Sequence, residues 1–184
     1  NKNKKSQKSG NNNKASNPNG IKNIYYDVEQ NILIVVGKQL AKVFSITPSD
    51  QHNDQAIRAR EIQNRKTKAI AQFKSAHKDK ITTSLYDYVH SHLYTTGGDF
   101  DRTCKQFTCG TTRDHNKMIG MFERHSYGIN LLHLDQNILA TGSTKGKLVN
   151  VFNTTNGEHV HTFNSFKFKL ASIHLYKKIN VIYV

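Results

Sequence analysis

The chain has 184 residues, enough for one sizeable hydrophobic core, and its 27 Lys and Arg against 13 Asp and Glu give a net charge of +14. That charge favours acidic partners: nucleic acid, an anionic membrane surface or an acidic protein face. No stretch approaches the roughly 20 apolar residues of a membrane helix. The Lys- and Asn-rich start lacks the apolar segment of a signal peptide.

The basic residues are unevenly distributed. Residues 1–22 hold six lysines and no acid, and the first 20 contain one aliphatic side chain, Ala15. Such a segment cannot bury enough surface to offset its chain entropy, so we expect a disordered basic tail over 1–22. The alternative is an arm that folds onto an acidic surface such as RNA, with Lys4 and Lys5 among its contacts.

Short apolar runs begin at Ile21 and predict β-strands. The segments 23–29, 31–37 and 40–46 are rich in Val, Ile, Tyr and Phe, are separated by short polar turns and show no helical periodicity. We therefore expect consecutive antiparallel strands, with further strands across 81–97 and 128–152.

The strand pattern repeats along the chain. Gln-Asn-Ile-Leu at 30–33 recurs at 136–139, and similar strands end in a glycine that is followed by a turn and an aromatic-ended strand. The glycines are Gly37, Gly97 and Gly142, the aromatics are Phe44, Phe107 and Phe152, and a further short strand ends in Phe73, Phe122 or Phe163.

The spacing of these aromatics indicates the repeated unit. Phe73 and Phe107 are 34 residues apart and Phe122 and Phe152 are 30 apart, whereas the gap from each aromatic-ended strand to the next varies between 29 and 11. One steady interval beside a variable one is typical of a repeating sheet with one variable surface loop. A four-stranded unit of about 40–45 residues is the period of a propeller blade.

These residues resemble the WD40 family, most specifically over 138–163 and more weakly over 23–184. The Trp-Asp pair of the family is replaced by Phe152-Asn153, Phe107-Thr108 and Phe44-Ser45, and its Gly-His pair is reduced to His77 and His125. The resemblance implies aromatics packed between neighbouring blades and a partly lost His–Asp network, with Asp87, Asp99 and Asp135 as possible acidic partners. The expected fold is all-β: a partial WD40-type β-propeller of three to four blades over 23–184, with a disordered basic N-terminal tail.

A charged insertion at about 47–68 is the main departure from the repeat. It is polar, its composition permits a short helix, and we expect either a solvated loop or a basic contact arm for a partner or RNA. The expected contact residues of this insertion are Arg58, Arg60, Arg65, Lys66 and Lys68.

Three to four blades cannot close a ring. Closure takes about seven blades, or about 300 residues at this period. An open arc exposes strand edges, which is unfavourable in isolation. We therefore expect either that the chain is part of a longer one or that a partner protein covers the open edges.

Several residues that invite a chemical role have a simpler structural interpretation. Cys104 and Cys109 are expected to be free thiols packed in a reducing compartment. The Gly142–Lys147 segment lacks the spacing and the helix of a phosphate-binding loop, so it predicts a β-turn with Gly146 at positive φ.

The histidines do not form a recognisable metal site. His90 and His92 are expected to alternate on one strand and so to share a face, and likewise His159 and His161. A zinc site needs a third or fourth ligand, and none is apparent beside either pair. We expect no metal, no cofactor and no small-molecule substrate.

The function expected from these features is that of a non-catalytic scaffold that binds other protein subunits in a multi-subunit assembly. The alternative is an RNA-associated subunit of a ribonucleoprotein or ribosome-assembly particle, and the basic segments favour it. Recognition of anionic lipid by loop lysines is a third option without a distinctive motif here. The expected location is intracellular, either cytoplasmic or nuclear.

Overall fold

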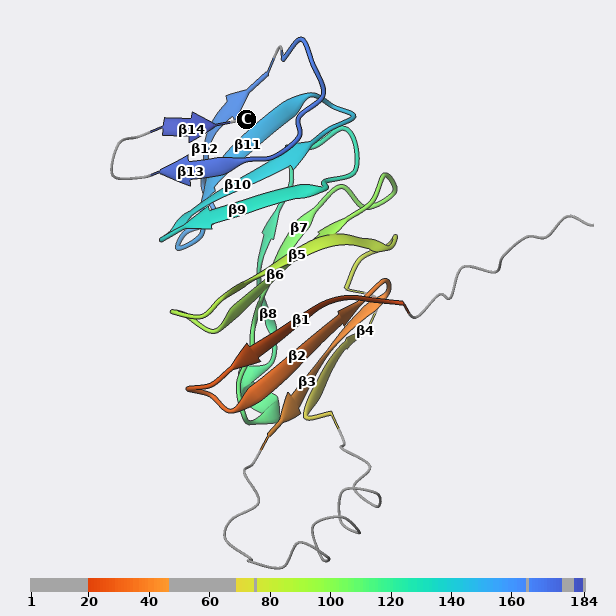
Figure 1. Ribbon diagram of the computed structural model, residues 1–184, viewed down its shortest axis with the longest axis vertical. Helices are drawn as coiled ribbons and strands as arrows, with labels where there is room; N and C mark the ends of the chain where they lie inside the picture. The colour runs from red at the N-terminus through yellow and green to blue at the C-terminus, as the bar shows by residue number, and fades with distance from the viewer. Residues whose placement is uncertain (1–19, 47–68, 75, 165, 177–180, 184) are drawn as a thin grey trace, which may run out of the picture.

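The computed structural model describes residues 20–46, 69–74, 76–164, 166–176 and 181–183. These residues form three antiparallel four-stranded sheets and a two-stranded sheet, which follow one another along the chain and are stacked one above the other in Figure 1. We call the four-stranded sheets blade 1, blade 2 and blade 3, and the two-stranded sheet the C-terminal hairpin. The all-β fold of successive four-stranded units is therefore confirmed.

Within each blade the strands pair in chain order, so each strand turns back beside the one before it. The bounds are β1 (Ile21–Asp27), β2 (Ile32–Gly37), β3 (Leu40–Ser45) and β4 (Ala71–Lys74) in blade 1; β5 (Ile81–Asp87), β6 (His92–Gly97), β7 (Cys104–Thr108) and β8 (Met118–Phe122) in blade 2; β9 (Leu131–Asp135), β10 (Ile138–Ser143), β11 (Leu148–Asn153) and β12 (His159–Phe163) in blade 3; and β13 (His174–Tyr176) and β14 (Val181–Tyr183) in the hairpin.

Two local features differ from the sequence-based boundaries. β1 begins at Ile21, two residues before the expected start of the repeats. The connection from β7 to β8 contains a short 3₁₀ helix, η1 (Arg113–His115), where no helix was expected.

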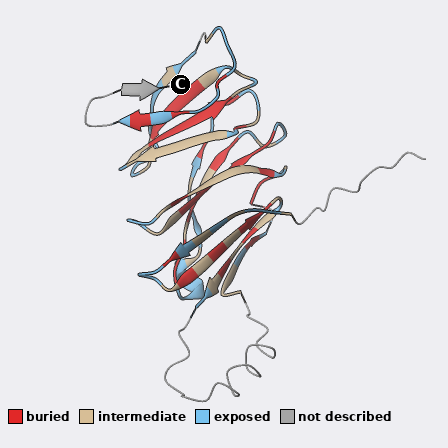
Figure 2. Ribbon diagram, viewed as in Figure 1, coloured by how far each residue is buried: buried red, intermediate tan, exposed pale blue. Residues whose placement is uncertain are grey.

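Burial along the second strand distinguishes blade 1 from the other two blades. In β2, Ile32, Ile34 and Val36 are fully buried, whereas Leu33 and Val35 between them are half-buried. Successive strand residues point to opposite faces, so one face of blade 1 is covered and the other is open. In β6 and β10 five consecutive residues are buried, as expected for strands covered on both faces (Figure 2).

Hydrophobic clusters lie between successive sheets and hold the stack together. The first joins blade 1 to blade 2, the second joins blade 2 to blade 3, and the third joins blade 3 to the C-terminal hairpin and the segment before it. Aromatic pairs lie in the first two: the ring centroids of Phe73 and Phe107 are 4.5 Å apart, and those of Phe122 and Phe152 are 5.3 Å apart. The steady sequence intervals therefore join the two members of each inter-blade aromatic pair.

The prediction for the turn at 142–147 is wrong about which residue has a positive φ. Gly146 has no positive φ; the left-handed residue of this turn is Lys147, with φ 52°. A side chain at Gly146 would instead place its Cβ 3.2 Å from the Tyr127 ring. Glycine is favoured here because the ring approaches the backbone closely.

The two histidine pairs are arranged differently. His90 lies in the turn before β6, with its Nδ1 2.7 Å from Asp87 Oδ2, so it does not alternate with His92 on a strand, but the two rings lie side by side with their centroids 5.8 Å apart. In β12 a bulge pairs Phe152 with His159 but Val151 with His161, which leaves these two histidines on opposite faces. The described residues contain no group of three or more His, Cys, Asp or Glu side chains that could hold a metal ion.

Candidate interaction surfaces

The basic contacts predicted from the sequence cannot be placed. The tail and the charged insertion, with all of their predicted contact residues, lie outside the described residues and stay predictions. Those residues are Lys4, Lys5, Arg58, Arg60, Arg65, Lys66 and Lys68.

The three repeat aromatics occupy matching places in their blades. Phe44, Phe107 and Phe152 each pair across the sheet with a leucine of the second strand. Phe107 and Phe152 are 4% and 3% exposed because each is covered by the preceding blade, whereas Phe44 is half-buried. The aromatic of blade 1 has no such neighbour among the described residues.

The repeat glycines match less closely. Gly37 and Gly97 each end the second strand of their blade. The pairing of β10 with β11 puts Gly142 opposite Val149, the place that Thr96 takes opposite Cys104 in blade 2. Gly142 therefore lies one position earlier than Gly97, and Ser143 takes the equivalent place.

His77 is the centre of a buried polar network in blade 2. Its Nδ1 lies 2.8 Å from Asp101 Oδ1 and its Nε2 lies 2.8 Å from Thr95 Oγ1, while the Thr103 hydroxyl and the Lys78 backbone N–H also donate to the Asp101 carboxylate. Burial raises the pKa of Asp101, but the hydrogen bonds from His77 and Thr103 outweigh it and bring that pKa to about 2. The network ties the segment entering β5 to the turn between β6 and β7.

The acidic partner in this network is a correction to the sequence-based expectation, which named Asp87, Asp99 and Asp135. Asp87 instead accepts from the turn that follows it, and Asp99 accepts from the Gly128 backbone N–H and from Lys145. Strand pairing puts Ile81 beside Gly97, so the turn after Gly97 lies next to the segment that carries His77, but this turn contains both Asp99 and Asp101 and the sequence does not distinguish them.

Blade 3 has only half of this network. His125 Nε2 lies 2.8 Å from Thr141 Oγ1, and the paired strands put Thr141 where Thr95 stands in blade 2. The segment 144–147 contains no acid, and His125 Nδ1 is buried without a hydrogen-bond partner. Burial lowers the pKa of His125 to about 4.

A second buried carboxylate joins blade 1 to blade 2. Asp27, the last residue of β1, accepts a 2.8 Å hydrogen bond from the Tyr86 hydroxyl and another from the backbone N–H of Gln30. Burial, which is the largest cause, together with the carboxylate raises the pKa of Tyr86 well above its ordinary value. This contact adds a polar link to the hydrophobic cluster between the two blades.

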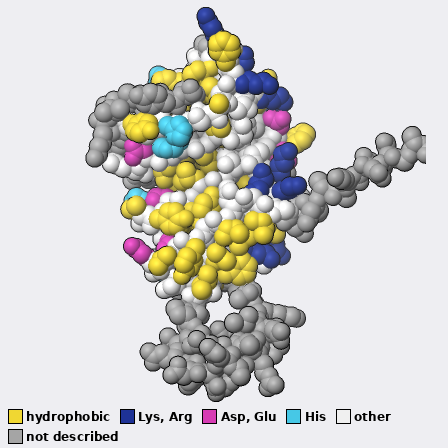
Figure 3. Space-filling model, viewed as in Figure 1, with side chains coloured by type: hydrophobic (Ala, Val, Ile, Leu, Met, Phe, Trp, Pro, Cys, Tyr) yellow, Lys and Arg dark blue, Asp and Glu magenta, His cyan; other side chains and the backbone are white. Residues whose placement is uncertain are grey.

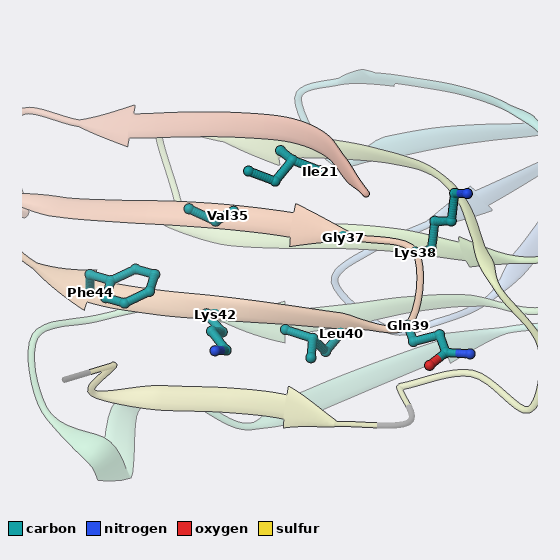
Figure 4. A pocket seen from close by; sticks show the side chains of 8 residues that line it. All are labelled: Ile21, Val35, Gly37, Lys38, Gln39, Leu40, Lys42 and Phe44. Carbon is teal, nitrogen blue, oxygen red and sulfur yellow. The ribbon is translucent and has the colours of Figure 1, made fainter. Parts of the chain in front are cut away.

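The outer face of blade 1 is open and largely apolar over β1, β2 and β3, whereas the exposed Gln72 and Lys74 lie on the same face in β4. Leu40 and Phe44 point from β3 to the same side as Val35 of β2, and with Ile21 they line a hollow of about 330 Å³ (Figure 4). Ile24, which pairs with Val35 on β1, is 58% exposed. Hydrophobic side chains gather over this blade in the space-filling view (Figure 3). We call the surface formed by Ile24, Tyr26, Leu33, Val35, Leu40, Lys42 and Phe44 the blade 1 outer face.

The cysteines and hydropathy bear on the chemical class of the chain. Cys104 and Cys109 are free and buried, and burial raises the pKa of Cys109 to about 12. Across the described part of the chain, no helix has the length and hydropathy of a membrane span.

Comparisons with known proteins bear on the fold alone. No protein-family model matches the chain, and no curated protein matches it by sequence. The structure is similar to a computationally designed protein, Ika8, with a TM-score of 0.61 at 14% identity, over 85% of this chain and 40% of that one. It is also similar to the WD40 repeats of RRP9, with a TM-score of 0.60 at 11% identity, over 86% of this chain and 42% of that one. The chain thus spans about two fifths of the length of these structures, and its fold resembles that of WD40 repeats.

Proposed function

We propose that this protein is a non-catalytic scaffold that binds another protein through the blade 1 outer face, as part of a multi-subunit assembly. The observation that supports this is the contrast between equivalent positions in the three blades. Leu33 and Phe44 are half-buried, whereas their counterparts in blades 2 and 3 are almost completely buried. Contiguous exposed apolar surface of this kind is typical of a protein interaction site.

The inner blades indicate the kind of surface that fits there. In each of them the aromatic of the third strand packs on a phenylalanine from the fourth strand of the preceding sheet. The partner that suits Phe44 is therefore an antiparallel sheet of another protein with an apolar outer strand carrying an aromatic side chain. Lys42 lies among the apolar side chains of this face and would meet an acid or the edge of that sheet.

The proposed cellular context follows from the cysteines. Two buried free thiols in a chain of this size suit a reducing compartment, so we propose an intracellular location, cytoplasmic or nuclear. RNA association is the second candidate function, favoured by a basic surface at one end of the blades.

The test is a substitution at the blade 1 outer face in the full-length protein, followed by isolation of its native assembly. Ile24→Lys should reduce recovery of the partner at least tenfold, because it buries an unpaired ammonium group in an apolar interface. Val89→Lys is the matched control, since Val89 is 85% exposed in a turn of blade 2. Circular dichroism of both variants establishes that the sheets are intact.

Crosslinking of the same assembly identifies what covers this face. We expect lysine crosslinks from Lys42 to a second protein, and their loss in Ile24→Lys but not in Val89→Lys. Unchanged partner recovery with Ile24→Lys would refute the proposal. So would crosslinks from Lys42 that reach only the same polypeptide, since the face would then be covered within one chain.

A further inference from the structure

One end of the stacked blades forms a continuous surface. It comprises the start of β1, the turns between second and third strands, and the segments that lead from each sheet into the next. We call it the loop face: residues 20–22, 38–39, 76–80, 98–103, 126–130, 144–147 and 166–173.

Hydrogen bonds join these loops from one blade to the next. The Ile81 backbone N–H donates to Lys38 O at 2.6 Å, and Gly98 N–H donates to Lys80 O at 3.2 Å. Gly128 N–H donates to Asp99 Oδ1 at 2.8 Å, and Lys147 Nζ donates to Lys167 O at 3.0 Å. The loops are therefore held together as one surface.

The loop face is strongly basic. It contains nine Lys and Arg residues against three Asp, and one of these, Asp101, is taken up by His77. The exposed cations are Lys22, Lys78, Lys80, Arg102, Lys145, Lys147, Lys167 and Lys169. Burial, followed by the positive charges of Lys80 and Lys38, lowers the pKa of Lys22.

The opposite end of the blades has a different charge. Its described turns, 28–31, 88–91, 109–117 and 154–158, contain two Lys and Arg residues against three Asp and Glu. In Figure 3 the Lys and Arg side chains gather along the right-hand edge, where β1 and β5 begin, with an acidic group among them, while the other acidic side chains and the histidines in view lie toward the left. The positive charge of the described turns and connections is thus concentrated at one end of the blades.

Exposed aromatic rings lie among these cations. Phe100 and Phe168 are 83% and 81% exposed, and Tyr127 is also exposed. The Lys145 ammonium lies 5.0 Å from the centre of the Tyr127 ring. Phe100 and Tyr127 are next to Asp99 and Gly128, the two residues whose hydrogen bond joins their loops.

We propose that the loop face binds single-stranded nucleic acid. Cations that follow the backbone and aromatic rings on which unpaired bases stack are the two parts of such a site. Paired bases cannot stack on these rings, so a duplex would engage only the charges. An acidic peptide would likewise bind the cations, but it has no bases that could stack on the exposed rings of Phe100 and Phe168.

The test uses the full-length protein and a fluorescently labelled twelve-nucleotide oligouridine, with affinity measured by anisotropy at several salt concentrations. Phe100→Ala and Phe168→Ala should each weaken binding about tenfold, since stacking is the interaction removed. Lys80→Glu combined with Arg102→Glu should weaken binding and reduce the slope of log affinity against log salt by roughly one.

Matched variants at the opposite end serve as controls. Tyr88→Ala and the pair Arg113→Glu with Lys117→Glu alter exposed residues of the same types and should leave the affinity unchanged. A variant without residues 1–19 should retain most of the binding. A twelve-residue polyglutamate peptide should bind more weakly than the oligonucleotide and should be insensitive to Phe100→Ala.

Four results would overturn this inference. They are unchanged oligonucleotide affinity in the loop-face variants, equal losses in the opposite-end variants, complete loss on removal of residues 1–19, and tighter binding of polyglutamate than of oligouridine. The last would assign the surface to an acidic protein partner. The scaffold proposal is tested separately, because Ile24→Lys lies outside the loop face and should bind oligouridine like the wild-type protein.

Discussion

Substitution of Phe107 by Ala measures how much the aromatic contact between blades contributes to stability. Phe107 is 4% exposed and its ring centroid lies 4.5 Å from that of Phe73 in the preceding blade. Truncation of a buried phenylalanine to alanine costs about 3–5 kcal/mol through lost burial and the remaining cavity. Phe44→Ala removes the equivalent ring from the half-buried blade 1 outer face and should cost only about 1 kcal/mol.

The assay is urea unfolding, monitored by far-ultraviolet circular dichroism. The slope of the free energy of unfolding against urea concentration should be the same for all variants. The difference between the two substitutions matters more than either value, because it isolates coverage by a neighbouring blade at the same repeat position. Equal losses for Phe44→Ala and Phe107→Ala, or a loss below about 1 kcal/mol for Phe107→Ala, would refute the packing argument.

Further predictions concern the buried polar groups and the thiols. Tyr86→Phe should destabilise the fold by about 2 kcal/mol in urea unfolding, because it leaves the Asp27 carboxylate short of a donor; a neutral result would contradict this. The pKa of His125 is lowered to about 4, so its contribution to stability is complete above pH 6.5 and is lost as the pH falls toward 4. His125→Gln should therefore reduce the loss of thermal stability across that window, and an unchanged pH dependence would contradict this. Cys104 and Cys109 should react with a thiol reagent only after unfolding; rapid reaction of the native protein would show that the cluster between the blades is not closed.

Much of the fold could be predicted because its signals are local. Alternating Val, Ile and aromatic runs define strands, and the aromatic spacing reflects a contact that recurs from blade to blade, as Phe73 with Phe107 and Phe122 with Phe152. The features that failed depend on single residues in three dimensions. The bulge at Val160 places His159 and His161 on opposite faces of the sheet. The Tyr127 ring that favours glycine at position 146 comes from a different loop.

The surfaces were harder to predict than the fold. The net charge pointed to the tail and the insertion, where the lysines and arginines are adjacent in sequence. The loop face draws its cations from six short segments, each with only one or two of them, so no window of the sequence reveals it. The blade 1 outer face was also hidden, because a half-buried Phe44 and a buried Phe107 follow the same sequence pattern and differ only in whether a sheet among the described residues packs on them.

Electron microscopy of the native assembly tests the central claim most directly, that stacked sheets leave the outer face of the first one for a protein partner. We predict density for an antiparallel sheet of a second protein seated on β1, β2 and β3, with an aromatic side chain against Phe44. Solvent at that face, or helices where the strands of blades 2 and 3 should be, would contradict it.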